Sequence, residues 1–484
     1  MKVFNSLSRK TEDFTPLDGR KINMYVCGLT PYDSAHIGHA RTYVSFDVIK
    51  RCLMRKGFSV FHIQNITDVD DKIIRRCRET GADPGQLTSQ NHAEALELLG
   101  KMHVIAADVY PKVTEHIPDI ISLIRQLIER GHAYENGSGV YFSISSFAKY
   151  GALSGQDLDE IRAGARVEVD ESKQDPADFA IWKKTDGELL EFDSPWGRGR
   201  PGWHIECSAM SQRYARRTLD IHGGARDLIF PHHENEIAQS EAASGQKYCN
   251  YWLHTGFLTV GGEKMSKSLG NFITLRQALS KSTPNALRLF YLQAHYRSPL
   301  DYDDDKLQAM EESVERIFNS LGLIREIAED GESHEDAAFR DTSDVLIAAF
   351  DAAMDDDFNT PDAIAALFSL LRLANSHIDT GKHDRKQLKR IEKALVGMLG
   401  VLGLVEPNSG IESRKDAVFA LLKEFSPGET PKDAEDALDT LVRIREEARK
   451  AKDYKKSDEI RARLKELGIA LEDKGGGGVR WKAG

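Results

Sequence analysis

Three residues near the N-terminus are suited to binding a nucleotide. His36, Gly38 and His39 follow a short apolar run and open a predicted helix. Backbone amides at a helix start attract anions, and imidazoles there can donate to phosphate. Gly38 lacks a Cβ, so a flat group such as adenine can lie against the backbone. Taken alone this pattern is weak, because histidines at a helix start more often serve as caps or surface residues.

A second segment, residues 264–268, carries two lysines within a glycine-framed stretch. Gly261 and Gly262 precede Lys264 and Lys267, and Gly270 follows them, which predicts a mobile loop with two ammonium groups. Positioned cations stabilise the charge that builds on phosphate oxygens during nucleotidyl transfer. An ordinary basic surface loop is the alternative when this segment is considered by itself.

Four residues from distant parts of the chain form a possible metal-ligand set: Cys27, Cys207, His232 and Glu236. Two thiolates, an imidazole and a carboxylate are ligands that zinc accepts. His232 and Glu236 are four residues apart, so they share one face of a helix. Spacing alone makes the two cysteines a weak metal signal.

The segment His233-Glu234 also begins the helix pattern of zinc peptidases. That pattern requires a second histidine four residues after the first, and this position holds Ile237. The sequence therefore argues against a peptidase.

The elements that must position these residues begin with a predicted βαβ unit. Residues 21–26 form an apolar strand, helical spacing follows from about residue 39 to Gly57, and residues 58–63 form a second strand. A strand, a helix and a strand in this order predict parallel pairing with a right-handed crossover. Cys27 and Thr67 follow the carboxyl ends of the two strands, where such sheets bind ligands.

The rest of the chain divides by pattern. Residues 110–200 read as an insertion, and a strand-like run returns at residues 219–224. After about Arg297 the pattern is helical. One apolar stripe runs through Leu307, Met310, Val314, Ile317, Leu321 and Ile324, and a second is predicted to begin at Val345, Ile347, Ala348 and Phe350. Residues 406–410 read as a linker.

Composition limits the classes of protein that remain. The net charge is −11, so RNA binding must come from local patches, and residues 443–465 carry ten Lys or Arg against five Asp or Glu. The five scattered cysteines argue against a disulfide framework. No apolar run reaches the roughly 18 residues of a membrane span, and no secretory signal is visible. We therefore expect a cytoplasmic protein without membrane partners.

The two nucleotide motifs together, in this order, resemble the signature of class I aminoacyl-tRNA synthetases. Further segments narrow the resemblance to the cysteinyl-tRNA synthetase family, and it extends over essentially the whole chain. These segments are residues 24–28, 65–68, 202–207, 230–236 and the region of 471–473.

The resemblance implies a reaction and a role for each motif. L-cysteine is activated by ATP, with Mg²⁺, to cysteinyl-adenylate and then transferred to the 3′ end of tRNA(Cys). His36, Gly38, His39 and Lys267 would bind ATP, with His36, His39, Lys264 and Lys267 as the catalytic residues. Cys27, Cys207, His232 and Glu236 would surround one zinc ion per chain, and Thr67 and Trp203 would line the cysteine pocket. We expect a monomer.

The resemblance also implies an architecture. A Rossmann-type α/β catalytic domain with a parallel sheet would span residues 1–297, with the connective insertion at about 110–200. An all-α bundle that contacts the tRNA stem and anticodon would span 298–405, and a small mixed α/β domain for anticodon recognition would span 406–484.

A zinc ion in such an enzyme would help to distinguish cysteine from serine. A pocket that reads shape alone separates substrates that differ by one small group by only about 1–3 kcal/mol. Zinc prefers a soft thiolate to a neutral hydroxyl, and it favours ionisation of a thiol whose free pKa is near 8.5. Serine would then be rejected without an editing domain, for which the insertion also looks too small.

Two departures from the family pattern are visible. Ala225 stands where the family often has a third glycine, and the tail is rich in glycine from Gly475 to Gly478. The second departure leaves open whether Trp481, between two cations, stacks on a base.

Two other functions compete with the leading one. A ligase that passes the cysteinyl-adenylate to an aminosugar amine would have a shorter C-terminal part, and an RNA-binding or cysteine-sensing paralogue would have lost motif residues that are intact here.

Overall fold

The computed structural model describes residues 1–157, 173–215, 218–265, 270–329, 331–407, 414–474 and 478–483. These residues form two compact units, 1–405 and 406–484. Lys267, one of the predicted catalytic residues, lies outside the described ranges. Within those ranges, no helix is both long and apolar enough to cross a membrane.

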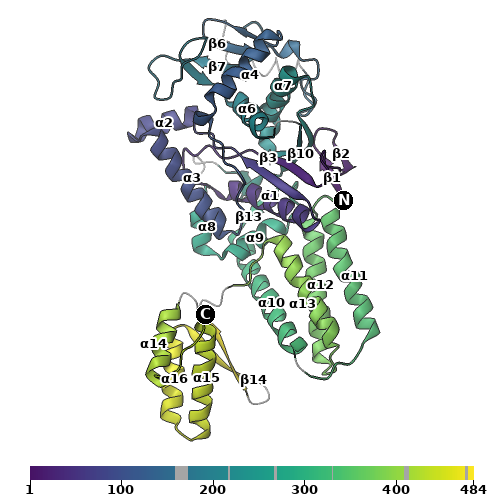
Figure 1. The fold of residues 1–484 in the computed structure, drawn as a ribbon, viewed down its shortest axis with the longest axis vertical. Coiled ribbons are helices and arrows are strands. Elements are labelled where there is room, and N and C mark those ends of the chain that lie inside the picture. Colours follow the sequence, from purple (N-terminus) through teal and green to yellow (C-terminus); the bar gives the residue numbers. More distant parts are fainter. Residues whose placement is uncertain are drawn as a thin grey trace. The chain divides into compact units, whose positions relative to one another are not determined.

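The first unit is built on a parallel four-stranded sheet (Figure 1). Its order is β10-β9-β3-β4, with β3 at Lys21–Val26, β4 at Ser59–Gln64, β9 at Leu219–Ala225 and β10 at Cys249–Thr255. Every neighbouring pair is parallel. Residues of β9 and β10 are buried almost throughout, as expected for strands that are covered on both faces.

The predicted βαβ unit is confirmed. Helix α1 (Ile37–Arg55) connects β3 to β4, and these strands pair in parallel from Lys21↔Ser59 to Val26↔Gln64. The helix is buried along most of its length because it packs in the main hydrophobic core. It begins two residues earlier than its apolar spacing predicts, because the side chain of His36 caps its first amides.

The region between β4 and β9 supplies helices and an antiparallel sheet of its own. The helices are α2 (Asp71–Thr80), α3 (Pro84–Lys101), α4 (Ile117–Glu129) and α6 (Trp203–Ala215). The sheet has the order β5-β6-β7-β8, with strands Ala133–Glu135, Gly139–Phe142, Phe179–Lys184 and Gly199–Pro201. A second hydrophobic core joins α4, α6 and this sheet.

A small three-stranded sheet carries the second motif. Its order is β12-β11-β13, with β11 at Leu258–Val260, β12 at Glu263–Lys264 and β13 at Leu300–Tyr302. Strand β11 pairs with β12 in antiparallel fashion and with β13 in parallel. Helices α7 (Glu234–Ser244), α8 (Leu275–Lys281) and α9 (Pro284–Leu292) complete this part of the unit, with the hairpin β1 (Lys2–Asn5) and β2 (Lys10–Asp13).

Four long helices lie side by side after the small sheet (Figure 1). They are α10 (Asp304–Glu329), α11 (Ala337–Asp355), α12 (Thr360–Asp379) and α13 (Arg385–Leu402). The stripe predicted on α10 is confirmed except for the half-buried Met310. The stripe predicted on α11 is confirmed only in part: Phe350 is buried and Ile347 is half-buried, but Val345 is 67% exposed. The buried face of this helix follows Phe339, Ser343, Phe350 and Met354.

The second unit pairs three helices with a hairpin. The helices are α14 (Lys415–Phe425), α15 (Ala434–Lys450) and α16 (Tyr454–Glu466), and the strands are β14 (Ile469–Lys474) and β15 (Gly478–Ala483). Leu438, Leu441, Ile444 and Ala448 are buried on α15. Trp481 packs against this core, and its indole N–H donates to Asp439 at 2.8 Å. Part of the indole surface is therefore used within the unit.

Candidate active site and metal centre

The four predicted metal ligands meet at the carboxyl end of the central sheet. Cys27, Cys207, His232 and Glu236 each offer one donor atom, and these atoms all lie within 4.8 Å of one another. Their exposures are 6%, 1%, 1% and 0%. Cys27 follows β3, Cys207 lies on α6, His232 enters α7 and Glu236 lies in its first turn. Segments that are far apart in the sequence thus converge on one buried point.

The cluster is strongly polarised. Burial opposes ionisation of Cys207, but the hydrogen bond with Cys27 and the nearby His232 bring the pKa of Cys207 down to about 6. Burial also disfavours a charged His232, yet Glu236 and Cys207 raise its pKa to about 10. Burial and the neighbouring Cys207 raise the pKa of Cys27. Glu236 has a lowered pKa despite burial, because His222 and His232 stabilise its charge.

This donor set fits a zinc ion. Two sulfurs, one imidazole nitrogen and one carboxylate oxygen are all ordinary zinc ligands. A metal would take over the compensating role that the proton on His232 plays, since ligands must be deprotonated and metal binding releases protons. Burying several ionisable side chains together costs folding free energy unless an ion of opposite charge is bound between them.

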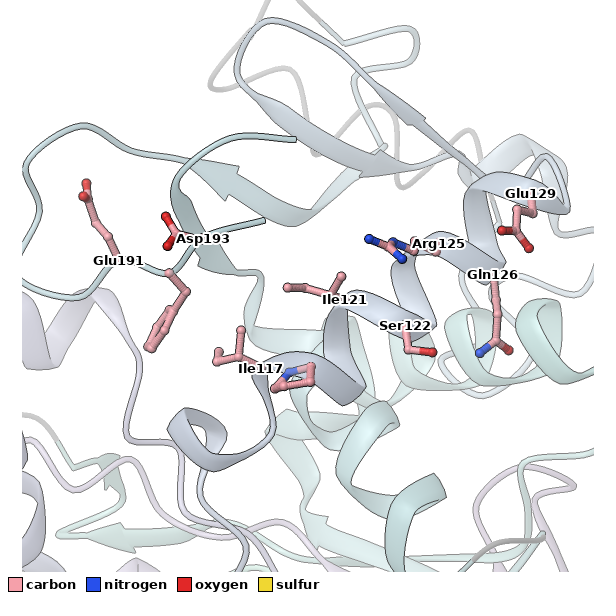
Figure 2. A pocket seen from close by; sticks show the side chains of 10 residues that line it. Ile117, Ile121, Ser122, Arg125, Gln126, Glu129, Glu191 and Asp193 are labelled. Carbon is pink, nitrogen blue, oxygen red and sulfur yellow. The ribbon is translucent and has the colours of Figure 1, made fainter. Parts of the chain in front are cut away.

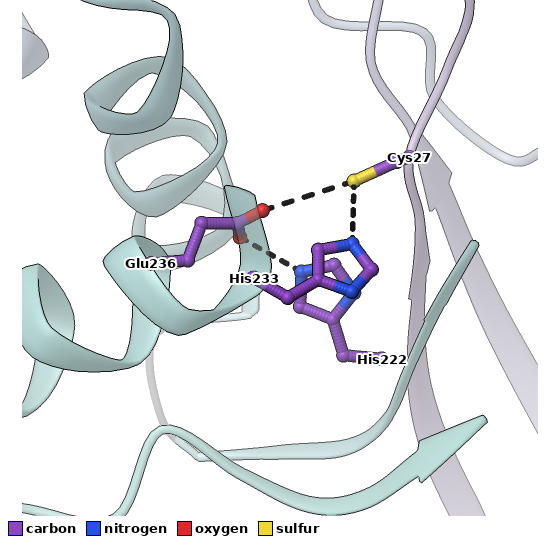
Figure 3. Close-up of side chains that lie close together, drawn as sticks. All are labelled: Cys27, His222, His233 and Glu236. Carbon is purple, nitrogen blue, oxygen red and sulfur yellow. Dashed lines mark hydrogen bonds and ion pairs between the residues drawn. The ribbon is translucent and has the colours of Figure 1, made fainter. Parts of the chain in front are cut away.

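Two further histidines surround the cluster (Figure 3). His222 Nε2 lies 2.8 Å from Glu236 Oε2, and His233 Nε2 lies 3.3 Å from Cys27 Sγ. Together with Cys27 and Glu236 they form a second donor set that overlaps the first. Tyr248 also donates to Glu236 Oε2 at 2.8 Å. Such partners orient ligands from outside the coordination shell.

The chain of polar contacts continues away from the cluster. His233 Nδ1 lies 2.8 Å from His254 Nε2, and His254 Nδ1 lies 2.8 Å from Ser6 Oγ. Burial and neighbouring histidines lower the pKa of His233 well below its usual value, and burial and His222 lower that of His254 to about 3. Both imidazoles are therefore neutral at physiological pH.

Of the two predicted cysteine-pocket residues, Trp203 contacts the cluster directly and Thr67 is linked through Asn65 to the residue after Cys27. The Trp203 ring stacks on His232 with centroids 4.3 Å apart, and Trp203 is 39% exposed. Thr67 is buried, and its Oγ1 accepts from Asn65 Nδ2 at 3.1 Å. Asn65 Oδ1 in turn accepts from the amide of Gly28, which follows Cys27, at 2.8 Å. The structure thus brings Thr67, Trp203 and the cluster together.

The first nucleotide motif forms the entrance of α1. His36 Nδ1 accepts from the amides of Gly38 and His39, at 3.1 and 3.3 Å, so the proton of neutral His36 lies on Nε2. His39 Nδ1 accepts from the His36 amide at 3.4 Å, which leaves its proton on Nε2 as well. Burial and the neighbouring His36 lower the pKa of His39. Both rings therefore present N–H donors that suit phosphate oxygens.

The described residues at both ends of the second motif lie near the first motif. Lys264 ends β12 and is exposed, with Nζ 5.9 Å from the centre of the Phe257 ring. After the motif, the amide of Leu275 donates to Ala35 O at 2.8 Å, and Ile273 O accepts from Ile37 at 3.2 Å. Met265 Cε lies 3.4 Å from the position that a Cβ on Gly38 would take. Met265 of the second motif thus lies close to Gly38 of the first.

Two sequence alternatives are resolved by the geometry. Glu234, the candidate general base of a peptidase, accepts from the amides of Gly151 and Ser154 at 2.9 and 2.7 Å and ties α7 to the insertion. Ala225 has ordinary extended dihedral angles (φ −75°, ψ 155°), so this position needs no glycine.

One groove lies elsewhere in the first unit (Figure 2). It has a volume of about 820 Å³ and is lined mainly by α4 and residues 191–193. Glu129, Glu191 and Asp193 outnumber the single cation Arg125 on its wall, which does not favour a phosphate ligand. None of the predicted site residues lines it, and we assign the chemistry to the sheet end instead.

Sequence reasoning missed three residues of the site: His222, Asn65 and Tyr248. His222 and Asn65 belong to segments that the sequence singled out, the strand run at 219–224 and the stretch 65–68. Asn65 lies two residues before Thr67, a predicted pocket residue, and this position could have marked it. Nothing in the sequence marked Tyr248.

The sequence matches three protein-family descriptions. They are "tRNA synthetases class I (C) catalytic domain" over residues 13–312, "DALR domain" over 349–406 and "Cysteinyl-tRNA ligase anticodon binding domain" over 432–481. A cysteine–tRNA ligase of Thermococcus onnurineus is 46% identical over 487 residues, covering 100% of this chain and 99% of that protein. One of Pelotomaculum thermopropionicum is 47% identical over 485 residues, with coverages of 100% and 99%.

Solved structures share the fold. Methionyl-tRNA synthetase of Mycobacterium tuberculosis, in complex with methionyl-adenylate, superposes with a TM-score of 0.60 at 17% identity, covering 87% of this chain and 94% of that one. The leucyl-tRNA synthetase of Agrobacterium radiobacter gives a TM-score of 0.60 at 12% identity, with coverages of 81% and 85%.

Proposed function

The chain belongs to the cysteine–tRNA ligase family, enzymes that charge tRNA with cysteine, and we propose that it selects cysteine through one zinc ion held in the buried cluster. Cys27, Cys207, His232 and Glu236 would hold that ion. The observation that carries this proposal is the convergence of four suitable donors within 4.8 Å. When bound, zinc supplies a soft Lewis acid that prefers thiolate sulfur to a neutral hydroxyl.

Thr67 and Trp203 would position the rest of the amino acid. Trp203 offers a partly exposed aromatic face beside His232. The Thr67 hydroxyl accepts from Asn65, so its own hydrogen remains to be donated, which suits the substrate carboxylate. Both contacts would place that carboxylate toward the nucleotide motifs and reduce the entropy cost of reaction.

The nucleotide motifs would then carry the first half-reaction. A carboxylate oxygen of cysteine attacks the α-phosphate of ATP, a P–O bond forms, and the bond to pyrophosphate breaks. The Nε2–H groups of His36 and His39 donate to the phosphates, and Gly38 leaves room for adenine. Lys264 and Lys267, with Mg²⁺, offset the charge that develops on the leaving pyrophosphate.

The second half-reaction needs no enzyme nucleophile. A terminal ribose hydroxyl of tRNA attacks the adenylate carbonyl, the new ester forms, and AMP leaves with the mixed anhydride bond broken. We propose that residues 298–405 contact the tRNA stem and anticodon and that residues 406–484 read the anticodon. The basic stretch 443–465 supports phosphate contacts there.

We propose catalysis by residues 1–297, action as a monomer, and a cytoplasmic location, where translation consumes charged tRNA. The aminosugar alternative is disfavoured because the relatives match this chain over its full length, including the C-terminal part.

The test combines metal analysis with the two half-reactions. Purified protein should contain about one zinc per chain by elemental analysis, and Cys27→Ala should contain much less. ATP–pyrophosphate exchange should depend on cysteine and respond weakly to serine, and purified tRNA should then be charged. A metal-free protein that still prefers cysteine to serine would overturn the zinc proposal.

A further inference from the structure

Arg41 is a buried arginine on the helix that carries the first motif. It lies two residues after His39 on α1 and is 1% exposed. Its Nη1 donates to Gly256 O at 3.1 Å and to Phe257 O at 2.5 Å, and its Nη2 donates to Ser298 O. One guanidinium therefore holds three backbone carbonyls.

All three carbonyls belong to the base of the small sheet. Gly256 and Phe257 connect β10 to β11, and Ser298 precedes β13. The chain approaches closely here: a Cβ on Gly256 would lie 2.2 Å from Ser298 O. Strand β11 leads through the Gly261-Gly262 turn to β12, which ends at Lys264. The guanidinium thus joins the helix of the first motif to the sheet of the second.

The contact is geometric and does not depend on an ion pair. In the described part of the chain, no carboxylate lies within ion-pair distance of Arg41. Burial lowers the pKa of Arg41 to about 10, so the group still carries its charge at neutral pH. Its planar fork can reach several carbonyls at fixed angles, which the single ammonium of lysine cannot.

We propose that Arg41 is a positioning residue for adenylate formation, which sets Lys264 of the second motif in register with His36 and His39. The three carbonyl bonds place the base of the small sheet against α1. This inference rests on the proposed role of Lys264 in the first half-reaction. Arg41 itself contacts neither substrate nor the reacting atoms in this assignment.

Arg41→Lys tests the proposal in the full-length enzyme. Single-turnover adenylate formation should slow by at least about tenfold, because small misplacements of charged groups cost large rate factors. The KM for ATP should change less than that rate. Transfer of cysteine from preformed adenylate to tRNA should stay within about twofold, since the second-motif cations act on pyrophosphate, which has already left.

Two companion variants separate positioning from general damage. Arg51→Lys makes the same substitution on the same helix, where the Arg51 guanidinium bonds Asp47 and the carbonyls of His103 and Gly400, and it should leave both half-reactions near wild type. Arg41→Ala should lose adenylate formation and recover part of it when guanidinium ion is added at millimolar concentration. Thermal melting of each variant establishes that it is folded.

Each outcome decides between the alternatives. Equal losses in both half-reactions, or an unchanged rate of adenylate formation in Arg41→Lys, would overturn the positioning role. Lys264→Ala is run in parallel: if it too leaves adenylate formation unchanged, the proposed role of the second motif fails. If Lys264→Ala slows the step and Arg41→Lys does not, only the inference about Arg41 fails.

Discussion

The cysteine side and the nucleotide side of the site differ in how the protein prepares them. The four candidate metal ligands are at most 6% exposed, and hydrogen bonds to Glu236 and Cys27 fix their surroundings. The nucleotide side is open: His36 and His39 are half-buried, and Lys264 is exposed at the end of a two-residue strand. One side is buried and preformed, and the other faces solvent.

The difference follows from what each side must recognise. Selecting a thiol over a hydroxyl depends on ligand softness and exact placement, which a rigid buried centre supplies. ATP is large and charged, so it must enter and leave with its water and Mg²⁺. Cations that approach it from an exposed strand can stabilise charge once the nucleotide has bound.

The largest expected effect comes from replacing one of the buried candidate metal ligands. Cys207→Ser should lower kcat/KM for cysteine by more than about 100-fold, which exceeds the usual cost of losing a residue outside the coordination shell. Zinc content should fall with it, while the affinity for ATP changes little. Cys249→Ser is the matched control, because Cys249 is equally buried on β10 but belongs to neither donor set. Parallel losses for cysteine and ATP would contradict the division between the two sides.

A substitution on the nucleotide side should lower the rate of adenylate formation without changing the preference for cysteine over serine. Lys264→Ala should slow single-turnover adenylate formation by about 10²–10³-fold, the usual effect of removing one group that stabilises developing charge. The preference for cysteine over serine should be retained. Lys281→Ala provides a control. Lys281 is an exposed lysine at the end of α8, and it forms an ion pair with Asp304 of α10. A variant that loses its cysteine preference would show that the two sides are not separate.

Removal of the second unit should spare both sides of the site. A chain ending at residue 405 keeps the compact first unit, so cysteine-dependent exchange should stay within about twofold, whereas charging should fall because phosphate contacts are lost. In the full-length chain, Lys455→Glu with Arg461→Glu should weaken charging and reduce its salt dependence. Undiminished charging by the truncated protein would show that residues 406–484 do not read the tRNA.

The sequence predicted the framework of the site better than its interior. Apolar spacing was enough for β3, α1 and β4, because these elements are local and their burial follows their own pattern. The face of α11 was predicted only in part: Phe350 is buried as expected, but Val345 is exposed, because the neighbouring helices cover the face that contains Phe339. Which face is buried depends on partners that a single helix does not encode.

The metal cluster shows the same limit. Cys27 and Cys207 are 180 residues apart, so spacing gave little support, and the resemblance to a family supplied the set. The structure places their donor atoms together, but the metal itself and the role of Lys267 stay predictions. His222 escaped notice because its contact with Glu236 depends on the pairing of β9 with β3. The sequence likewise did not distinguish Arg41 from other basic residues on helices, because its three carbonyl partners come from distant segments.

The smallest predicted effect concerns the pH dependence of stability at His62, a buried histidine outside the candidate metal site. His62 on β4 is 5% exposed, neither ring nitrogen has a hydrogen-bond partner among the described residues, and burial with the nearby Lys50 lowers its pKa to about 3. Its unfolded pKa is near 6.5, so the unfolded chain binds an extra proton between these values. Protonation of the unfolded chain at His62 therefore lowers the free energy of unfolding as the pH falls from 6.5 toward 3, and above pH 6.5 this loss is absent.

His62→Leu should therefore flatten the acid side of the stability curve. Between pH 7 and pH 5 the free energy of unfolding should fall by about 2 kcal/mol less than in wild type, measured by urea unfolding at each pH. His334→Leu is the control: His334 is exposed, so its replacement should keep the wild-type slope. Equal slopes for wild type and His62→Leu would mean that burial does not hold this imidazole neutral. A flattened slope that is the same with and without added zinc would assign the effect to burial alone, because His62 lies outside both donor sets.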